Sequence, residues 1–143
     1  MDKLADPILQ VLSDYKAAVY ARDVDAFVSL YDPNLVVYDM WRVWKYDGIA
    51  SWRQMTEGWF GALGEDRVVV DFSDVHTVVG DDVAVVHAFV NFRAVSGDGV
   101  DLRAFDNRLS AALKRTGESW KIVHQHTSGP IDPANATVIF NRE

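Results

Sequence analysis

Asp39 is the residue of this sequence best placed for acid–base chemistry. It ends a run of β-branched and aromatic residues that begins at Leu35, and Trp41 and Trp44 follow it closely. A carboxylate with aromatic neighbours and few cations loses hydration, which raises its pKa and makes it a better proton acceptor near neutral pH. The alternative is an ordinary aspartate at the end of a strand, capping a turn or facing water. The residues alone leave both interpretations open.

Two more groups of polar residues lie on predicted strands. Asp106 and Arg108 share one face of their strand, because side chains alternate, and such a face either lines a polar cavity or meets solvent. A nearby guanidinium favours an ionised Asp106, and its planar fork suits a carboxylate or carbonyl oxygen of a ligand. His87 and Asn91 share a face of the preceding strand, which we expect to point into the same cavity. A lone histidine on a strand is, however, more often an ordinary core residue.

His124 and His126 are two residues apart on the last long strand and therefore point the same way. Such a pair can ligate a metal, but the site would need a glutamate shortly afterwards and a further histidine on a later strand. The sequence has neither. We expect the pair to be buried and hydrogen-bonded or to lie at a subunit contact, and we predict no metal and no other cofactor.

Aromatic side chains are abundant, with five tryptophans in 143 residues. Such residues more often form a core than a ligand site. A hollow fold nevertheless needs large side chains on its walls, and walls of this kind favour a flat or polycyclic apolar ligand. We expect Met55 and Trp59, on the third predicted helix, and Trp41 to contact such a ligand.

The elements that must position these residues follow from the pattern of the chain. Asp6 and Pro7 begin a helix with an apolar face, Asp23 caps a shorter helix, and a third helix follows Asp47-Gly48. Asp32-Pro33-Asn34 predicts a turn before a strand over 35–40. The remaining strands are predicted at 67–79, 83–95, 101–114 and 120–128. Short turns join these four strands, so they must run antiparallel.

Length and charge limit the classes of function. A chain of 143 residues suits one domain, which we place at 1–143 with a C-terminal tail from 131. The net charge of −7 argues against nucleic-acid binding, which needs lysine and arginine against phosphates. No apolar stretch approaches the ~20 residues of a membrane span. We expect a cytoplasmic protein without membrane contact.

Two stretches of the chain carry a family resemblance. The spacing of Tyr15, the Asp23-Val24-Asp25 segment and Asp39 resembles the opening of the ketosteroid isomerases. Arg108 and the stretch 120–130 are similar to the SnoaL-like branch and to the association domain of the calcium/calmodulin-dependent protein kinase. The order of elements resembles the nuclear transport factor 2-like fold. This α+β fold is a cone-shaped, curved antiparallel sheet with three helices from the N-terminal half on its concave face.

The resemblance implies roles for individual residues. Asp39 becomes a general base that moves a proton beside a carbonyl, and Tyr15 becomes a hydrogen-bond donor to the resulting oxyanion rather than only a core residue. Asp106 takes the place of a second, protonated acid, although Arg108 beside it would keep it ionised and unable to donate. His87 is a further candidate donor.

The function implied is a cofactor-independent isomerase, cyclase or dehydratase. Its ligand would be a small apolar or polycyclic molecule with a carbonyl or carboxylate, and the protein would be a homodimer. The alternative is a non-catalytic ligand-binding or dimerising module of the same fold, which holds an acidic metabolite through Arg108.

Overall fold

The computed structural model describes residues 6–142 and contains three helices and eight strands within that range. The helices are α1 (Pro7–Ala21), α2 (Val24–Val28) and α3 (Ile49–Ala62). The strands are β1 (Tyr31–Tyr38), β2 (Tyr46–Asp47), β3 (Arg67–Val79), β4 (Val83–Val95), β5 (Asp101–Thr116), β6 (Ser119–Ser128), β7 (Ile131–Asp132) and β8 (Thr137–Val138).

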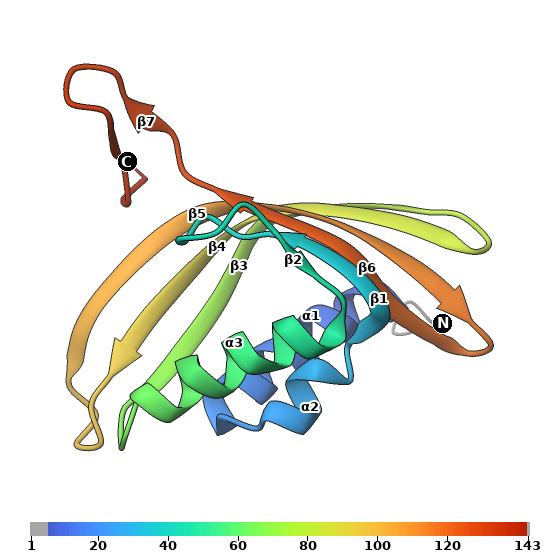
Figure 1. Cartoon of the computed structure of the whole chain (residues 1–143), viewed down its shortest axis with the longest axis horizontal. Helices are drawn as coiled ribbons and strands as arrows, with labels where there is room; N and C mark the ends of the chain where they lie inside the picture. The colour runs from blue at the N-terminus through green and yellow to red at the C-terminus, as the bar shows by residue number, and fades with distance from the viewer. Residues whose placement is uncertain (1–5, 143) are drawn as a thin grey trace.

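Six strands form one curved sheet in the order β2-β1-β6-β5-β4-β3, and the helices lie against its concave side (Figure 1). The predicted α+β cone is therefore confirmed. The four long strands run antiparallel as expected, but β1 pairs with β6 in parallel. No short turn joins β1 to β6, so the argument from turn length never applied to this pair.

The helix starts follow the predicted capping pattern. The Asp6 carboxylate accepts hydrogen bonds from the N–H groups of Ile8 and Leu9, and Asp23 accepts one from Ala26. Each bond satisfies a donor that the first helical turn leaves without a partner. One face of α1 is buried against the sheet, and its buried residues are Ile8, Val11, Leu12, Tyr15, Ala18 and Val19.

Strand β1 begins earlier than predicted. It starts at Tyr31, and its pairing with β6 shifts register between Tyr31 and Val36. Within this irregular segment the Asn34 N–H donates to the Asp32 carboxylate at 2.8 Å. The turn signal was therefore real, but it makes a bulge inside the strand, which tolerates a proline that has no N–H to donate.

The curvature of the sheet has a local cause in β3. Its pairing with β4 shifts register between Ser73 and His76, and Asp74 adopts a left-handed backbone conformation with φ 52°. A bulge of this kind bends the strand and increases its twist. The bent sheet curves over α3 (Figure 1).

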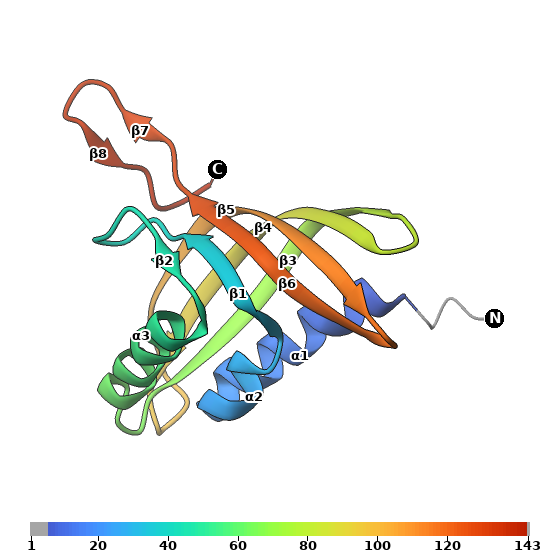
Figure 2. The same ribbon diagram turned by 45° about the vertical axis from the view of Figure 1, so that its right-hand side comes forward.

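After β6 the chain forms a small β7–β8 hairpin that projects from the sheet (Figure 2) and then returns to β5. The Asp106 N–H donates to the Phe140 carbonyl, and the Phe140 ring stacks on Trp41 at 5.7 Å between centroids. Two segments of the chain approach closely at Gly129, where an added Cβ would lie 2.7 Å from a methyl carbon of Val138. Glycine is required there for lack of space.

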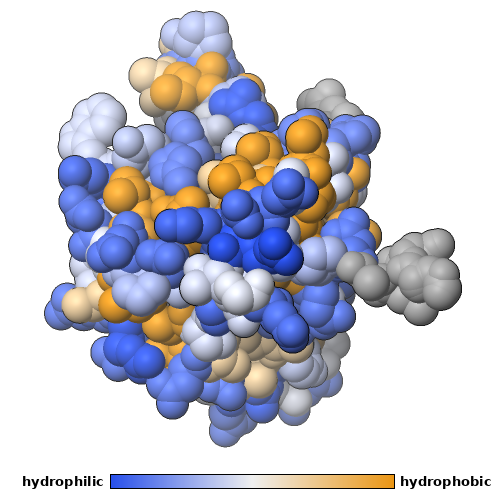
Figure 3. Space-filling view, turned by 90° about the vertical axis from the view of Figure 1, so that its right-hand side faces the viewer, coloured by the Kyte–Doolittle hydropathy of each residue, from blue (hydrophilic) through white to orange (hydrophobic). Residues whose placement is uncertain are grey.

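The face of the molecule in Figure 3 mixes polar residues with separate apolar groups. Val78, Val83 and Val85 near the β3–β4 turn are 73%, 58% and 43% exposed. Across residues 6–142, no helix has both the length and the apolar character needed to cross a membrane.

Candidate active site

A cavity of about 560 Å³ lies between the concave face of the sheet and α3. This volume is in the range of small-molecule sites. Helix α3, strands β4, β5 and β6 and the segment after β1 supply most of its walls. The lining residues include Tyr15, Asp39, Trp41, Arg42, Tyr46, Trp52, Met55, Trp59, Phe92, Arg103, Phe105, Asn107, Gln125 and Thr127.

Asp39 lies on the cavity wall immediately after β1, where the strand alternation turns it inward like buried Val37. The Thr127 hydroxyl donates to one Asp39 carboxylate oxygen at 2.9 Å. Burial raises the pKa of Asp39, and the hydrogen bonds from Thr127 and the Met40 N–H offset part of that rise. Asp39 is therefore desolvated as expected, and its carboxylate is a stronger base than an exposed aspartate. Trp44, one of the two aromatic neighbours on which that expectation was based, is 96% exposed and does not contribute.

Tyr15 reaches the same cavity from the buried face of α1. It is 8% exposed, and its ring packs at 5.0 Å from Phe27 and 5.8 Å from Phe72. Burial raises the pKa of its hydroxyl, and the negative charge of Asp39 raises it further. The hydroxyl is therefore protonated at neutral pH, and it donates no hydrogen bond to residues 6–142. It remains available to donate to a guest molecule.

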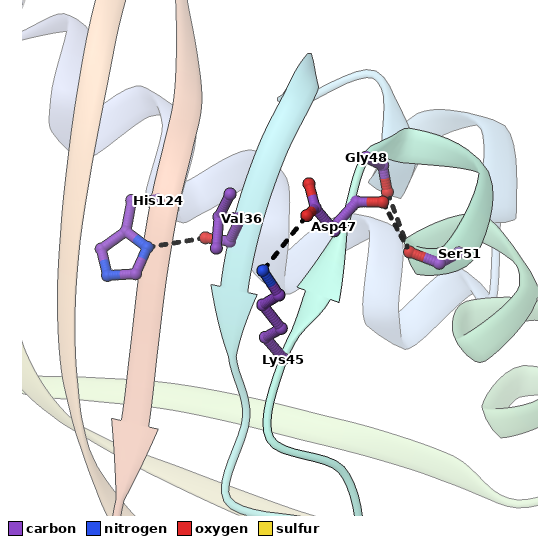
Figure 4. A network of polar contacts seen from close by, with 6 residues as sticks. All are labelled: Val36, Lys45, Asp47, Gly48, Ser51 and His124. Atoms are coloured by element: carbon purple, nitrogen blue, oxygen red, sulfur yellow. Dashed lines mark hydrogen bonds and ion pairs between the residues drawn. The ribbon is translucent and has the colours of Figure 1, made fainter.

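Strand β1, which ends just before Asp39, has neighbouring strands on both sides, β6 and β2 (Figure 4). On one side the His124 Nδ1–H donates to the Val36 carbonyl at 2.7 Å. On the other side β2 pairs with β1, and the Gly48 N–H donates to the Leu35 carbonyl at 2.8 Å. Next to this pairing, Lys45 pairs with Asp47 at 3.3 Å, and the Ser51 hydroxyl donates to the Gly48 carbonyl at 3.1 Å. These contacts anchor the β1–β2 hairpin to β6 and to the start of α3.

The two histidines of β6 make packing contacts in the structure. His124 is half-buried and hydrogen-bonded, as predicted, whereas His126 is exposed. Both pack against Tyr38, at 4.8 and 5.5 Å between ring centroids. Within the described range, no three histidine, aspartate or glutamate side chains gather in a metal-binding arrangement.

Three of the predicted ligand contacts line the cavity. Met55 and Trp59 reach it from α3, and Trp41 reaches it from the loop after β1. Trp41 is 44% exposed and lies at the opening, where Phe105 packs edge-to-face against it at 5.6 Å. These side chains form flat apolar walls.

The prediction for Asp106 and Arg108 is wrong. Both residues lie on the outer face of β5, while Phe105, Asn107 and Leu109 face inward. The alternation was assigned correctly, but the polar face meets solvent and the apolar face lines the cavity. Arg108 donates to the Ser128 hydroxyl at 3.1 Å and does not approach a ligand site.

His87 and Asn91 lie on the same outer face, so their predicted contact with a ligand in the cavity is also wrong. His87 is exposed and stacks on His76 at 5.1 Å. Asn91 stands opposite Asp106 and donates to its carboxylate at 2.9 Å. The physical reason is the same as for β5, since cross-strand neighbours share a face.

Asp106 instead anchors the C-terminal tail. Its carboxylate accepts the Arg142 N–H at 2.9 Å, and this bond, with the one from Asn91, holds its pKa below the ordinary 3.8. Asp106 is thus ionised as expected, but not because of Arg108. The Arg142 guanidinium lies 3.8 Å above the Phe89 ring.

We expect Asp106→Ala to release this tail. The Arg142 amide should exchange with solvent about tenfold faster, since a hydrogen bond to a charged group contributes ~1.5 kcal/mol or more. Because the native pKa is lowered, the contribution is complete above pH 3.8 and is lost as the pH falls through the lowered value. Hydrogen exchange measures this, with Arg108→Gln as the control. Unchanged protection of Arg142 in Asp106→Ala would contradict the assignment.

Asn107, Gln125 and Thr127 are cavity residues that the sequence analysis did not identify. Asn107 and Gln125 are 5% and 3% exposed. The Asn107 Oδ1 is buried without a hydrogen-bond partner in the described structure, and the Gln125 Oε1 accepts the Tyr31 hydroxyl at 2.6 Å. A buried polar atom without a partner is costly, so a guest that donates to Asn107 is favoured. The available signal was a polar residue in phase with Leu109.

Comparison with known proteins gives a consistent family assignment. A family model described as SnoaL-like domain matches residues 8–132. A search of curated proteins found no match.

Solved structures share the fold at low sequence identity. A nuclear transport factor 2-like protein of unknown function from Pseudomonas putida is 22% identical, with TM-score 0.85, over 100% of this chain and 99% of that one. A candidate calcium/calmodulin-dependent protein kinase II association domain from Xanthomonas campestris is 16% identical, with TM-score 0.74, over 89% and 88%. Aln2 from a Streptomyces species is 11% identical, with TM-score 0.77, over 90% and 91%. At these identities the likeness concerns the fold alone.

Proposed function

The chain belongs to the SnoaL-like domain family, and from this membership and the cavity we propose that it catalyses proton transfer beside a carbonyl group. The substrate is a flat, apolar small molecule, and the reaction is an isomerisation, cyclisation or dehydration without a cofactor. The fold itself hosts several activities, so the proposal depends on the site and not on the fold.

One observation carries the proposal: a carboxylate with a raised pKa and a protonated tyrosine line the same apolar cavity. Asp39 supplies the base and Tyr15 supplies a neutral donor. Neither makes an ion pair with a described residue that would quench its chemistry. Pairs of titratable groups whose environments separate their pKa values are typical of acid–base catalysis.

The steps follow from these positions. The Asp39 carboxylate takes the proton from the carbon beside the carbonyl, and the C–H bonding pair becomes the C=C bond of an enolate. Negative charge collects on the carbonyl oxygen, where the Tyr15 hydroxyl donates a hydrogen bond. Protonated Asp39 then returns the proton to the same or another carbon. Oriented donors of this type contribute ~3–4 kcal/mol to lowering the barrier.

Solvent exchange of an acidic ketone tests the proposal directly. We expect the protein to accelerate the replacement of the α-hydrogens of 2-tetralone by deuterium, measured by proton NMR in D₂O. The rate should rise with pH and level off once Asp39 is ionised, with its midpoint above the ordinary aspartate pKa of 3.8. A rate equal to that of buffer at every pH would overturn the proposal. Binding of the ketone without exchange would instead support the alternative, a ligand-binding module.

We also propose that the protein forms a homodimer through the outer face of the sheet. Val78, Val83 and Val85 expose apolar surface there, and contiguous apolar surface of this kind favours association. Light scattering at micromolar concentration should give about twice the chain mass of 16.0 kDa. A single 16.0 kDa species would contradict the dimer. The cytoplasmic location stays a prediction.

A further inference from the structure

The described cavity wall carries three charged side chains, namely one carboxylate, Asp39, and the two guanidinium groups of Arg42 and Arg103. This local excess of positive charge runs against the composition of the chain, whose net charge is −7. Arg42 lies in the loop between β1 and β2, whereas Arg103 lies near the start of β5. Both are exposed, so their charges lie where the cavity meets solvent.

Neither arginine has a carboxylate partner among residues 6–142. Other arginines of the chain do, since Arg53, Arg93 and Arg115 pair with aspartates at 2.9, 2.8 and 3.6 Å. Arg42 and Arg103 therefore keep their full hydrogen-bonding capacity for a group that enters from outside. Guanidinium forks match carboxylate, sulfonate and phosphate oxygens with paired, charge-assisted hydrogen bonds.

The two arginines at the cavity mouth do not cancel the raised pKa of Asp39, the base proposed inside the cavity. Asp39 owes its raised pKa to burial, and the groups that oppose the rise are Thr127 and the Met40 N–H. The charge of Arg42 instead acts on Tyr46, where it opposes the larger effects of burial and of Asp39 on the tyrosine pKa. The cavity therefore holds the proton acceptor, Asp39, apart from the two arginines that can bind a negatively charged group.

We propose that the guest carries an anionic group at one end, and that Arg42 and Arg103 bind this group at the cavity mouth. The flat apolar body then lies between Trp41, Met55 and Trp59. The identity of the inner end, a carbonyl beside Asp39, rests on the proposed function. The anion determines which end of the guest enters first, because apolar walls alone cannot distinguish the two orientations.

Two fluorescent probes with one ring system test the mouth without any acid–base chemistry. They are 8-anilinonaphthalene-1-sulfonate and its uncharged parent, N-phenyl-1-naphthylamine. We expect the native protein to bind the sulfonate about tenfold more tightly. The Arg42→Gln/Arg103→Gln double variant should lose this preference and keep its affinity for the uncharged probe within about twofold. Added salt should weaken sulfonate binding, because salt screens the attraction between the sulfonate and the exposed arginines. If the sulfonate instead responded mainly to the negative net charge of the protein, added salt would screen that repulsion and strengthen binding.

Two controls make the result specific to the cavity. Arg108→Gln/Arg115→Gln changes the net charge equally but on residues that do not line the cavity, and it should leave the preference intact. Met55→Trp should weaken binding of both probes alike, because Met55 lines the cavity and an indole there takes up space that a guest would occupy.

Several outcomes would overturn the inference: equal affinity of the native protein for the two probes, probe binding that Met55→Trp leaves unchanged, an unchanged preference in the cavity double variant, or an equal loss in the control. Failure of ketone exchange with the sulfonate preference intact would reject the proton transfer and leave the anion site standing. The reverse pattern would reject only the anion site.

Discussion

Asp39→Asn is expected to lower the rate of α-proton exchange on bound 2-tetralone by about 10²–10⁴-fold, the range that a positioned general base contributes. Asparagine retains the size of the side chain. Its amide oxygen can also accept the hydrogen bond that the Thr127 hydroxyl donates to the Asp39 carboxylate at 2.9 Å in the native protein. It removes the negative charge and, with it, the ability to take a proton. The affinity for the ketone, measured by tryptophan fluorescence, should change little because the apolar walls are intact.

The stability of this variant separates lost chemistry from lost folding. A carboxyl whose pKa is raised by folding favours the native state when protonated, and this advantage is lost as the pH rises through the native pKa. At pH 7 the ionised Asp39 therefore costs stability that asparagine does not. Urea unfolding should show Asp39→Asn to be at least as stable as the native protein at pH 7, with the difference shrinking toward pH 3.8. A variant that is inactive and also destabilised at pH 7 would not support the role of Asp39.

Phe27→Ala is expected to reduce the free energy of unfolding by ~3–5 kcal/mol, as for other buried phenylalanines. Phe27 is fully buried, and five aromatic rings surround it at centroid distances of 5.0 to 6.2 Å. They belong to Tyr15, Tyr31, Trp52, Trp59 and Phe60. Three of these, Tyr15, Trp52 and Trp59, also line the cavity. The substitution should therefore loosen the site as well as the core.

Urea unfolding at pH 7 measures the first effect, and Leu9→Ala is the matched control. Leu9 lies on α1 but is 47% exposed, so its truncation should cost well under the loss at Phe27. The second effect is weaker binding of N-phenyl-1-naphthylamine under conditions where Phe27→Ala is still folded. A loss of stability below about 1 kcal/mol would show that the aromatic cluster does not hold α2 against the rest of the core.

Local signals were sufficient for most of the architecture. The Asp6 and Asp23 caps, the apolar face of α1 and the four long strands follow from contacts within a few residues, which is why the pattern predicts them. The predicted positions of Tyr15 and Asp39 in one cavity also hold, since each lies on the buried face of its own element. Their catalytic roles stay predictions.

What the sequence alone could not decide is which side of β5 encloses the guest. Alternation divides Asp106 and Arg108 from Asn107 and Leu109, but it does not say which set faces the helices. The helices cover the apolar set, because burying it removes the larger nonpolar area from water. This choice turned Asp106 outward and made Asn107 a cavity residue.

The pairing of β1 with β6 and the return of the tail to Asp106 were equally beyond the sequence. Both join segments that are distant along the chain, and such contacts leave no periodic trace in either segment. The sequence determined the elements and the division of each strand into two faces through short-range physics. The tertiary structure decided which faces meet, and with that it placed Arg42 and Arg103 on one cavity, because only the packed sheet brings the loop after β1 and the start of β5 to the same cavity wall.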